Sequence, residues 1–240
     1  MTGEPTIVAT SAQFRFDRRE QPHVGPVMRH ALELSGATAP RVCWVGTAGG
    51  EDPVGRGRVL GALAEAGARP SYLTLFPWPN VDDVTAHLLA QDVVWVGGGS
   101  VINLLALWRA HGVEAAMRTA WEAGVVLGGV SAGSLCWHTG GTTDSYGPDL
   151  RPVTNGLGLL PYSNCPHYDS EEQRRPLYQR LVADGTLAAG WATDDGVGLV
   201  FRGTELVEAV GERQDAAAWR VEPDGAGGAR ETRLAPRQLG

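Results

Sequence analysis

The first half of the chain alternates short apolar segments with longer amphipathic segments, and this alternation restricts the fold more than any other feature of the sequence. The apolar segments are hydrophobic on both faces, as in the strands of a parallel sheet that is covered on both sides. We expect strands at residues 7–10, 42–45, 72–76, 93–96 and 125–127, and helices at residues 27–34, 56–66, 81–90 and 101–120. The pattern predicts an α/β fold with a mostly parallel sheet and helices on both faces, whose ligands bind outside the carboxyl ends of the strands.

The second half of the chain is richer in β-like segments. We expect short strands at residues 187–193, 197–201, 206–210 and 216–221. No segment between the halves has the composition of a linker, so the sequence predicts one hydrolytic α/β domain over residues 1–222. Residues 223–240 are rich in Gly, Pro and Arg, which predicts a mobile C-terminal tail.

Composition and charge exclude several classes of partner. The chain has 240 residues, of which 43% are hydrophobic, and this is enough for a large buried core. No apolar run approaches the ~20 residues that cross a bilayer, and the N-terminal segment lacks the basic-then-apolar plan of a signal peptide. We therefore expect a cytoplasmic protein with no membrane partner. The formal net charge of −7, without a block of cations, argues against a nucleic-acid partner.

The cysteines and histidines indicate neither disulfides nor a metal site. Cys43, Cys136 and Cys165 are odd in number and widely separated, which fits reduced thiols. The six histidines are dispersed, and no H-E-x-x-H or cysteine-pair spacing occurs. The sequence therefore predicts a protein without a metal ion or cofactor.

Residues 129–133, GVSAG, match the G-x-S-x-G pattern between an expected strand and the helical run that follows. In a nucleophile elbow, small neighbours allow a sharp turn at the serine, and the helix N-terminus lies beside it. The pattern therefore nominates Ser131 as a nucleophile. Two simpler interpretations stay open, namely an ordinary serine in a glycine-rich turn and a serine that caps the helix.

A nucleophilic serine needs a base to remove its proton, and two histidines follow Ser131 in the chain. His138 would lie two turns along the same expected helix, roughly 10 Å away, which is too far. His167 lies in the loop-like segment NCPHYD, from which it can return to the carboxyl edge of the sheet. His167 is therefore the predicted base.

The base in turn needs a carboxylate to orient it. Asp194 and Asp195 follow an expected strand, and Asp144 is a third candidate. Successive strand residues point to opposite faces, so only one of the adjacent pair is expected to reach the imidazole. We expect Asp169, two residues after His167, to cap the next helix instead.

The expected strand at residues 93–96 runs into Gly97, Gly98 and Gly99 before a helix begins. Glycines let the backbone approach a ligand and present N–H groups to it, as in an oxyanion hole. Phosphate binding is the competing interpretation, although neither a G-x-G-x-x-G nor a P-loop pattern is present.

Four motifs, WVGGGSVINLL, GGVSAGSLCW, CPHYD and ATDDG, occur in this order and together resemble peptidase family S51, which comprises aspartyl dipeptidases and cyanophycinase relatives. The resemblance implies a class I glutamine-amidotransferase-like fold and a serine-type peptidase that acts on dipeptides or short peptides. It implies a triad of Ser131, His167 and Asp195. It also implies oxyanion donors at the backbone N–H groups of Gly98 or Gly99 and of Ala132.

The sequence departs from the family pattern in two places. The loop after the first strand, residues 10–15, reads TSAQFR where family members often have glycines, and the acid is the shorter aspartate where it is often glutamate. Aspartyl specificity is therefore left open. Arg174 and Arg175 are candidates for binding a substrate carboxylate, or else form a solvated helix face that balances nearby glutamates.

Two other functions remain as alternatives. One is a serine esterase or amidase, in which Asp144 would restore the Ser, Asp, His order of α/β-hydrolases, although the 36 residues from Ser131 to His167 leave little room for the usual intervening elements. The other is a non-catalytic member of the same fold that binds a small molecule in the same pocket.

Overall fold

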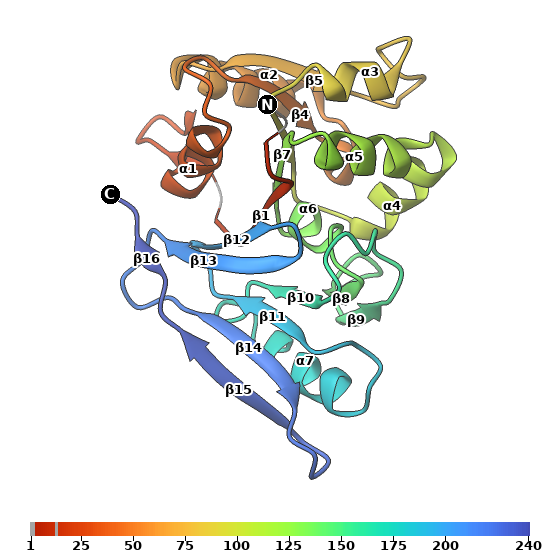
Figure 1. The fold of residues 1–240 in the computed structure, drawn as a ribbon, viewed down its shortest axis with the longest axis vertical. Coiled ribbons are helices and arrows are strands. Elements are labelled where there is room, and N and C mark those ends of the chain that lie inside the picture. Colours follow the sequence, from red (N-terminus) through yellow and green to blue (C-terminus); the bar gives the residue numbers. More distant parts are fainter. Residues whose placement is uncertain (1–2, 13) are drawn as a thin grey trace.

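The computed structural model describes residues 3–12 and 14–240, and its centre is an eight-stranded sheet in the order β16-β13-β12-β1-β7-β6-β4-β5 (Figure 1). Five neighbouring strands run parallel, and each overlaps one of the strands expected in the first half of the chain, although the strand expected at residues 72–76 overlaps only at residues 72 and 73. They are β1 (Thr6–Thr10), β7 (Val126–Val130), β6 (Val93–Val96), β4 (Arg41–Val45) and β5 (Arg69–Leu73). The predicted α/β fold is confirmed.

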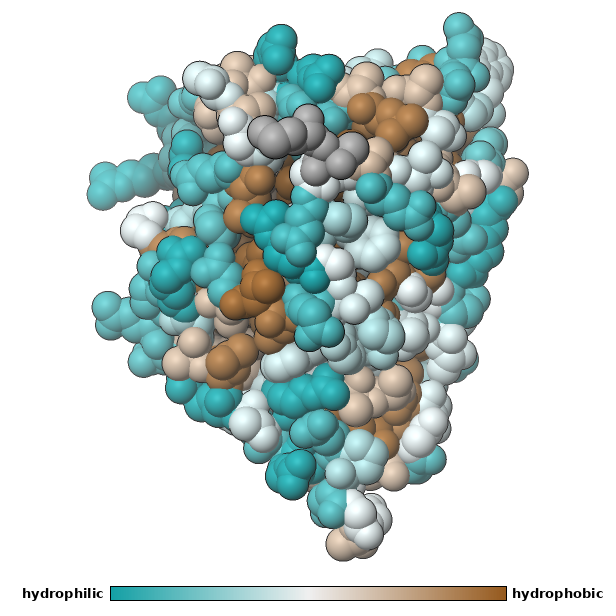
Figure 2. Space-filling model, in the orientation of Figure 1, coloured by the Kyte–Doolittle hydropathy of each residue, from teal (hydrophilic) through white to brown (hydrophobic). Residues whose placement is uncertain are grey.

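Helices cover both faces of this sheet, and each face has its own apolar cluster (Figure 1). On one face lie α1 (Pro26–Leu34) and α2 (Pro53–Glu65), and on the other lie α3 (Val84–Leu89), α4 (Val101–Ala110) and α5 (Val113–Glu122). The single helix expected at residues 101–120 is two helices, because Gly112 adopts a left-handed conformation with φ 69° between them. On the face shown in Figure 2, hydrophilic residues cover most of the surface.

A six-stranded second sheet has the order β15-β14-β11-β10-β8-β9, and α7 (Arg174–Ala183) packs on it. Its strands are β8 (Gly140–Thr143), β9 (Arg151–Val153), β10 (Ser163–Pro166), β11 (Gly190–Thr193), β14 (Ala218–Pro223) and β15 (Ala229–Leu234). The strands β12 (Val197–Arg202), β13 (Glu205–Gly211) and β16 (Arg237–Gln238) return to the first sheet, and β2 (Arg15–Phe16) pairs with β3 (Pro22–His23). No helix in the described ranges combines the length and apolar character that a membrane span requires.

The C-terminal segment corrects one expectation from the sequence. Residues 223–240, predicted to be a mobile tail, contain β15 and β16, and β15 pairs with β14 along its whole length. Three of the four glycines of this segment, Gly225, Gly227 and Gly228, belong to the turn between β14 and β15, where the Asp224 carboxylate accepts hydrogen bonds from the N–H groups of Ala226 and Gly228. The composition that indicated mobility is therefore that of a tight hairpin.

The hairpin is tied to the rest of the protein through Glu231 on β15. Its carboxylate accepts two N–H bonds from Arg175 on α7 and the hydroxyl hydrogen of the buried Tyr168. We expect Glu231→Ala to lower the free energy of unfolding in urea by about 1–3 kcal/mol, because the tyrosine hydroxyl loses its acceptor. Arg233→Ala, an exposed change on the same strand, should alter the free energy by less than about 0.5 kcal/mol. Equal stability of the two variants would mean that β15 is not docked.

Candidate active site

Ser131 occupies a strained turn between β7 and the short helix α6 (Ala132–Leu135). Its φ of 57° and ψ of −114° are unusual for a residue with a side chain. Glycines on both sides make the turn possible, since a Cβ on Gly129 would lie 2.4 Å from the Gly133 carbonyl oxygen and one on Gly133 would lie 2.3 Å from the Val96 oxygen. The Ser131 N–H donates to the Thr10 oxygen at 3.1 Å, which fixes the turn to β1. This is the backbone geometry of a nucleophile elbow.

His167 and Asp195 meet because β10 and β11 are parallel neighbours whose carboxyl ends lie together, with Pro166 opposite Thr193. His167 Nδ1 lies 2.5 Å from Asp195 Oδ1. An ionised carboxylate only accepts hydrogen bonds, so Nδ1 carries the hydrogen and Nε2 is the nitrogen free to take a proton. The bond from His167 holds the pKa of Asp195 below its usual value, although burial acts in the opposite direction.

Asp194 follows the end of β11 and makes no hydrogen bond to His167 among the described residues. Its carboxylate accepts hydrogen bonds from the N–H of Ala217 at 2.8 Å and from Trp219 Nε1 at 3.1 Å. Burial raises the pKa of Asp194. Asp194 therefore supports β14, whereas Asp195 serves the imidazole.

Two residues that the sequence analysis did not assign to the site hold this pair. The Asp169 carboxylate accepts the Asp195 N–H at 2.8 Å and an N–H of Arg213 at 3.0 Å. Asp169 thus does not cap α7, whose first residue, Arg174, lies five positions later in the chain. The Ser11 hydroxyl oxygen accepts the His167 N–H at 3.0 Å, across 156 positions of sequence. For these two supporting residues, the sequence contained one indication, which is that Asp169 belongs to the same motif, CPHYD, as His167.

His138 lies in the core and away from this pair. Its Nδ1 contacts the Ser134 oxygen at 3.0 Å, and its ring packs edge-on against Phe201. Burial lowers the pKa of His138 to about 4, so the ring stays neutral near pH 7. The helix expected here ends at Leu135, after a single turn. His138 is therefore a core residue.

The glycine strip, residues 97–99, lies against the Ser131 turn. A Cβ on Gly98 would lie 3.2 Å from Ser131 Cβ, and one on Gly99, whose φ is 131°, would lie 2.3 Å from the Ala48 oxygen of the 3-10 helix η1 (Thr47–Gly49). The N–H groups of Gly98, Gly99 and Ala132 donate to no acceptor within residues 3–12 and 14–240. An oxyanion donor needs an N–H group without a protein acceptor, and these three groups meet that condition.

We expect Gly98→Ala to lower kcat by roughly tenfold with little change in the melting temperature. The added methyl group would press on Ser131 Cβ and shift the strip by a few tenths of an ångström, and a misplacement of a full 1 Å costs about 10²-fold, so a smaller shift should cost less. Gly61→Ala is the control, because a Cβ there would lie in open space on α2. A Gly98→Ala variant with kcat within twofold of wild type would contradict the close contact.

Ser131 and His167 line the walls of two cavities. A polar cavity of about 550 Å³ includes Asp144, Glu171 and Arg174 in its wall. The buried Arg174 donates to the Thr142 oxygen and pairs with Glu171 at 2.8 Å. Arg175, the other arginine proposed from the sequence, lies outside this wall, where it pairs with Glu231. Asp144 is exposed at the rim, while Asp195 already occupies His167 Nδ1.

The family follows from a comparison with known proteins, because residues 9–209 match the model of peptidase family S51. The chain belongs to peptidase family S51. This confirms the resemblance drawn from the four motifs. It also identifies the protein as a peptidase, with the Ser131 turn and the His167–Asp195 pair inside the matched region.

Relatives of this S51 peptidase share its length and fold. The uncharacterized peptidase YgaJ of Bacillus subtilis (strain 168) is 40% identical over 193 residues, which cover 80% of this chain and 83% of that protein. Peptidase E of Streptomyces coelicolor is 30% identical over 145 residues, or 59% and 58% of the two chains. Among solved structures, a peptidase from an acI-B1 Actinobacterium has a TM-score of 0.67 at 16% identity, with 98% and 96% of the chains covered.

Proposed function

We propose that this S51 peptidase hydrolyses dipeptides or short peptides with Ser131 as nucleophile, His167 as general base and Asp195 as the orienting carboxylate. The observation that carries the proposal is the strained Ser131 turn in the same cavity wall as the His167–Asp195 pair. Backbone strain at a residue with a side chain persists where the surroundings enforce it, and such residues cluster at active sites. His167 has the same feature, with φ 58°.

In this mechanism the Ser131 Oγ attacks the carbonyl carbon of the scissile amide while His167 Nε2 takes the hydroxyl proton. The carbonyl oxygen becomes an oxyanion, which the N–H groups of Gly98 or Gly99 and of Ala132 stabilise. Asp195 stabilises the imidazolium that forms. His167 then protonates the leaving amine, and the C–N bond breaks to leave an acyl ester on Ser131. A water molecule, deprotonated by His167, hydrolyses the ester and restores the serine.

One contact of this mechanism forms only with substrate. Ser131 Oγ makes no hydrogen bond to His167 among the described residues, although both side chains line the same two cavities. Catalytic hydrogen bonds are often long without substrate and shorten in the Michaelis complex. The proposal therefore includes a rotation of the serine side chain when a carbonyl group binds.

The preference for short peptides is supported by the loop between β8 and β9. This loop contributes Asp144 and Ser145 to the wall of the polar cavity, and the Ser145 hydroxyl accepts the Val101 N–H at 2.9 Å, which ties the loop to α4. A wall fixed at this place restricts how far a peptide can extend past Ser131. Arg174, a candidate from the sequence for binding a substrate carboxylate, lies in the same wall, but its guanidinium is already paired with Glu171.

The proposal is tested with a library of dipeptides and tripeptides and with an unfolded protein. Each is incubated with the enzyme in the presence and in the absence of EDTA, and the products are analysed by mass spectrometry. We expect release of free amino acids from the short peptides, no internal cleavage of the protein, and no effect of EDTA. Loss of activity in EDTA that zinc restores, or efficient internal cleavage, would contradict the proposed mechanism or the proposed substrate size. Hydrolysis of simple esters with no hydrolysis of peptides would indicate the esterase alternative.

A further inference from the structure

The second cavity beside Ser131 is apolar, and the mechanism above does not use it. It has a volume of about 330 Å³, and aromatic rings of Phe14, Phe16 and Trp44 form one side of it. Ser131 and His167 line its other side. We call it the aromatic cavity. It lies at the loop after β1, where the sequence departs from the glycines that family members often carry.

Two of the three rings of the aromatic cavity pack against neighbouring groups. Phe14 and Trp44 meet edge to face, with centroids 5.9 Å apart and planes at 70°. Trp44 also lies directly against the glycine strip, since a Cβ on Gly97 would come within 2.9 Å of its ring. Phe16, in contrast, is 62% exposed, so its ring has area left to cover a ligand. The cavity thus has an apolar wall of three aromatic rings, of which the Phe16 ring is exposed.

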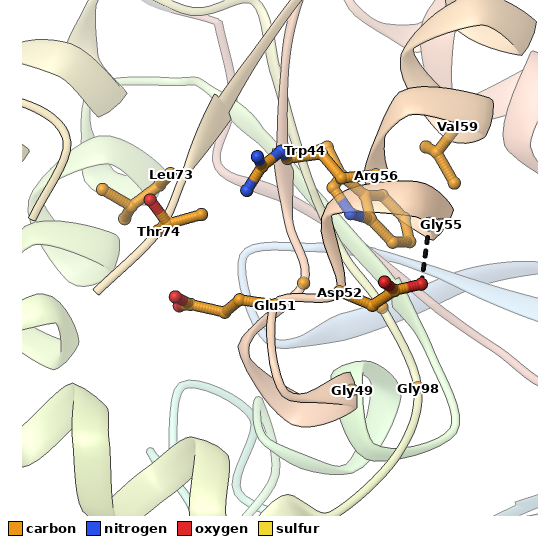
Figure 3. Close-up of a pocket in the computed structure, with 12 residues that line it drawn as sticks. Trp44, Gly49, Glu51, Asp52, Gly55, Arg56, Val59, Leu73, Thr74 and Gly98 are labelled. Atoms are coloured by element: carbon orange, nitrogen blue, oxygen red, sulfur yellow. Dashed lines mark hydrogen bonds between the residues drawn. The ribbon is translucent and has the colours of Figure 1, made fainter. Parts of the chain in front are cut away.

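A neighbouring cavity, which also has Trp44 in its wall, is a poorer candidate for the substrate (Figure 3). Its volume is only about 150 Å³. The buried Glu51 carboxylate there already accepts the N–H groups of Leu75 and Phe76, and the Asp52 carboxylate caps α2 through Val54 and Gly55. Neither Ser131 nor His167 is part of its wall, which is formed by other residues of the described chain.

We propose that the aromatic cavity binds a large apolar side chain, with an aromatic ring as the best fit, on one side of the scissile bond of the substrate. This inference rests on the proposed serine peptidase function. His167 is the only titratable residue among the described residues that line the cavity, so an acidic side chain would find no arginine or lysine there. A buried ring, in contrast, would gain apolar contact and edge-to-face partners.

The polar cavity also disfavours an acidic side chain of the substrate. Its one arginine, Arg174, is already neutralised by Glu171, and Asp144 adds a negative charge at the rim. An aspartyl side chain in either cavity therefore meets no net positive charge. The expected order of preference at the selective position is Phe and Leu above Ala, and Ala above Asp.

The test uses two series of dipeptides, X-Ala and Ala-X, with X as Phe, Leu, Ala or Asp. We expect one series to show kcat/KM for Phe at least about tenfold above that for Ala, and that for Asp below both. Phe16→Ala and Phe14→Ala should each reduce the Phe-to-Ala ratio severalfold or more. Trp78→Ala, which removes an aromatic residue that is 73% exposed elsewhere on the surface, should leave the ratio unchanged.

A binding measurement separates this inference from the proposed function. Calorimetry on the Ser131→Ala variant should give a lower Kd for the preferred Phe dipeptide than for Ala-Ala, and Phe16→Ala added to that variant should abolish the difference. Phe-selective binding without hydrolysis in wild type would refute the serine mechanism and keep the aromatic cavity. Hydrolysis with equal rates for Phe and Ala, or a Phe preference that survives both phenylalanine substitutions, would overturn the aromatic cavity alone.

Discussion

Ser131→Ala should lower kcat by ~10⁴-fold or more while the melting temperature stays close to that of wild type. Without the hydroxyl the acyl ester cannot form. Because triad members act as a unit, His167 and Asp195 then no longer contribute to catalysis through the serine. The change removes one oxygen from a half-buried side chain that has no hydrogen-bond partner among the described residues. Turnover is measured on the best dipeptide, and folding is measured by calorimetry.

Ser134→Ala is a matched control in the same turn of helix. Its hydroxyl donates to Asn164 Oδ1 at 3.0 Å in a fully buried site, so its loss should cost stability, about 1 kcal/mol, and leave kcat within a few fold of wild type. Ser131→Ala activity within tenfold of wild type would remove Ser131 from the mechanism.

Asp195→Asn should lower kcat by roughly 10³- to 10⁴-fold. The amide keeps the shape of the side chain, but its NH₂ group can favour the wrong imidazole tautomer, and the charge that stabilises the imidazolium is lost. The pKa of Asp195 lies below its usual value, so the carboxylate is ionised throughout the neutral range in wild type. The loss should therefore persist at every pH between about 6 and 9, as measured by kcat on one dipeptide.

Asp194→Asn, at the adjacent position, is the control, and it should lower stability more than kcat. One carboxylate oxygen accepts from Ala217 and the other from Trp219, so an amide would turn its NH₂ group toward one of these donors. We expect a stability loss of about 1–3 kcal/mol and a fall in kcat of less than tenfold. Asp144→Asn should also cost less than tenfold. If Asp144→Asn lowered kcat severely and Asp195→Asn left kcat nearly unchanged, the triad assignment would be wrong. Asp144 would then be the orienting carboxylate, in the Ser, Asp, His order of α/β-hydrolases.

The parallel strands were predictable because they are buried on both faces and therefore apolar throughout. The prediction for β5 was wrong in its bounds, because the apolar run at residues 72–76 extends past the strand, which ends at Leu73. Beyond the strand, the N–H groups of Leu75 and Phe76 donate to the Glu51 carboxylate. That contact joins residues 24 positions apart and leaves no local pattern.

β10 was missed for the opposite reason, because a buried strand here contains a polar residue. The Asn164 amide receives a bond from Ser134 and donates to the Trp191 oxygen, so it is satisfied inside the protein. Such satisfaction depends on tertiary contacts, and the sequence SNCP therefore looked like a loop. The C-terminal hairpin was hidden in the same way by its turn residues.

Ser131 and His167 could be proposed from the sequence because each lies in a motif with its own chemistry, whereas the choice of Asp195 over Asp194 and Asp144 came from the family resemblance. The supporting residues could not be proposed, because Ser11 and Asp169 act through contacts with distant segments of the chain. The aromatic cavity needs Phe16 and Trp44 to face Ser131 from separate strands, and no spacing in the sequence encodes that.

The nucleophile is tested most directly by reaction with a fluorophosphonate, followed by tandem mass spectrometry of proteolytic peptides. Only a serine whose proton can be removed by a nearby base reacts quickly with such a probe. We expect one adduct per chain, located on Ser131, with rapid labelling in wild type and in Asp194→Asn, slow labelling in Asp195→Asn and none in Ser131→Ala. Peptide hydrolysis by a protein that remains unlabelled at Ser131, or an adduct on a different residue, would contradict the account.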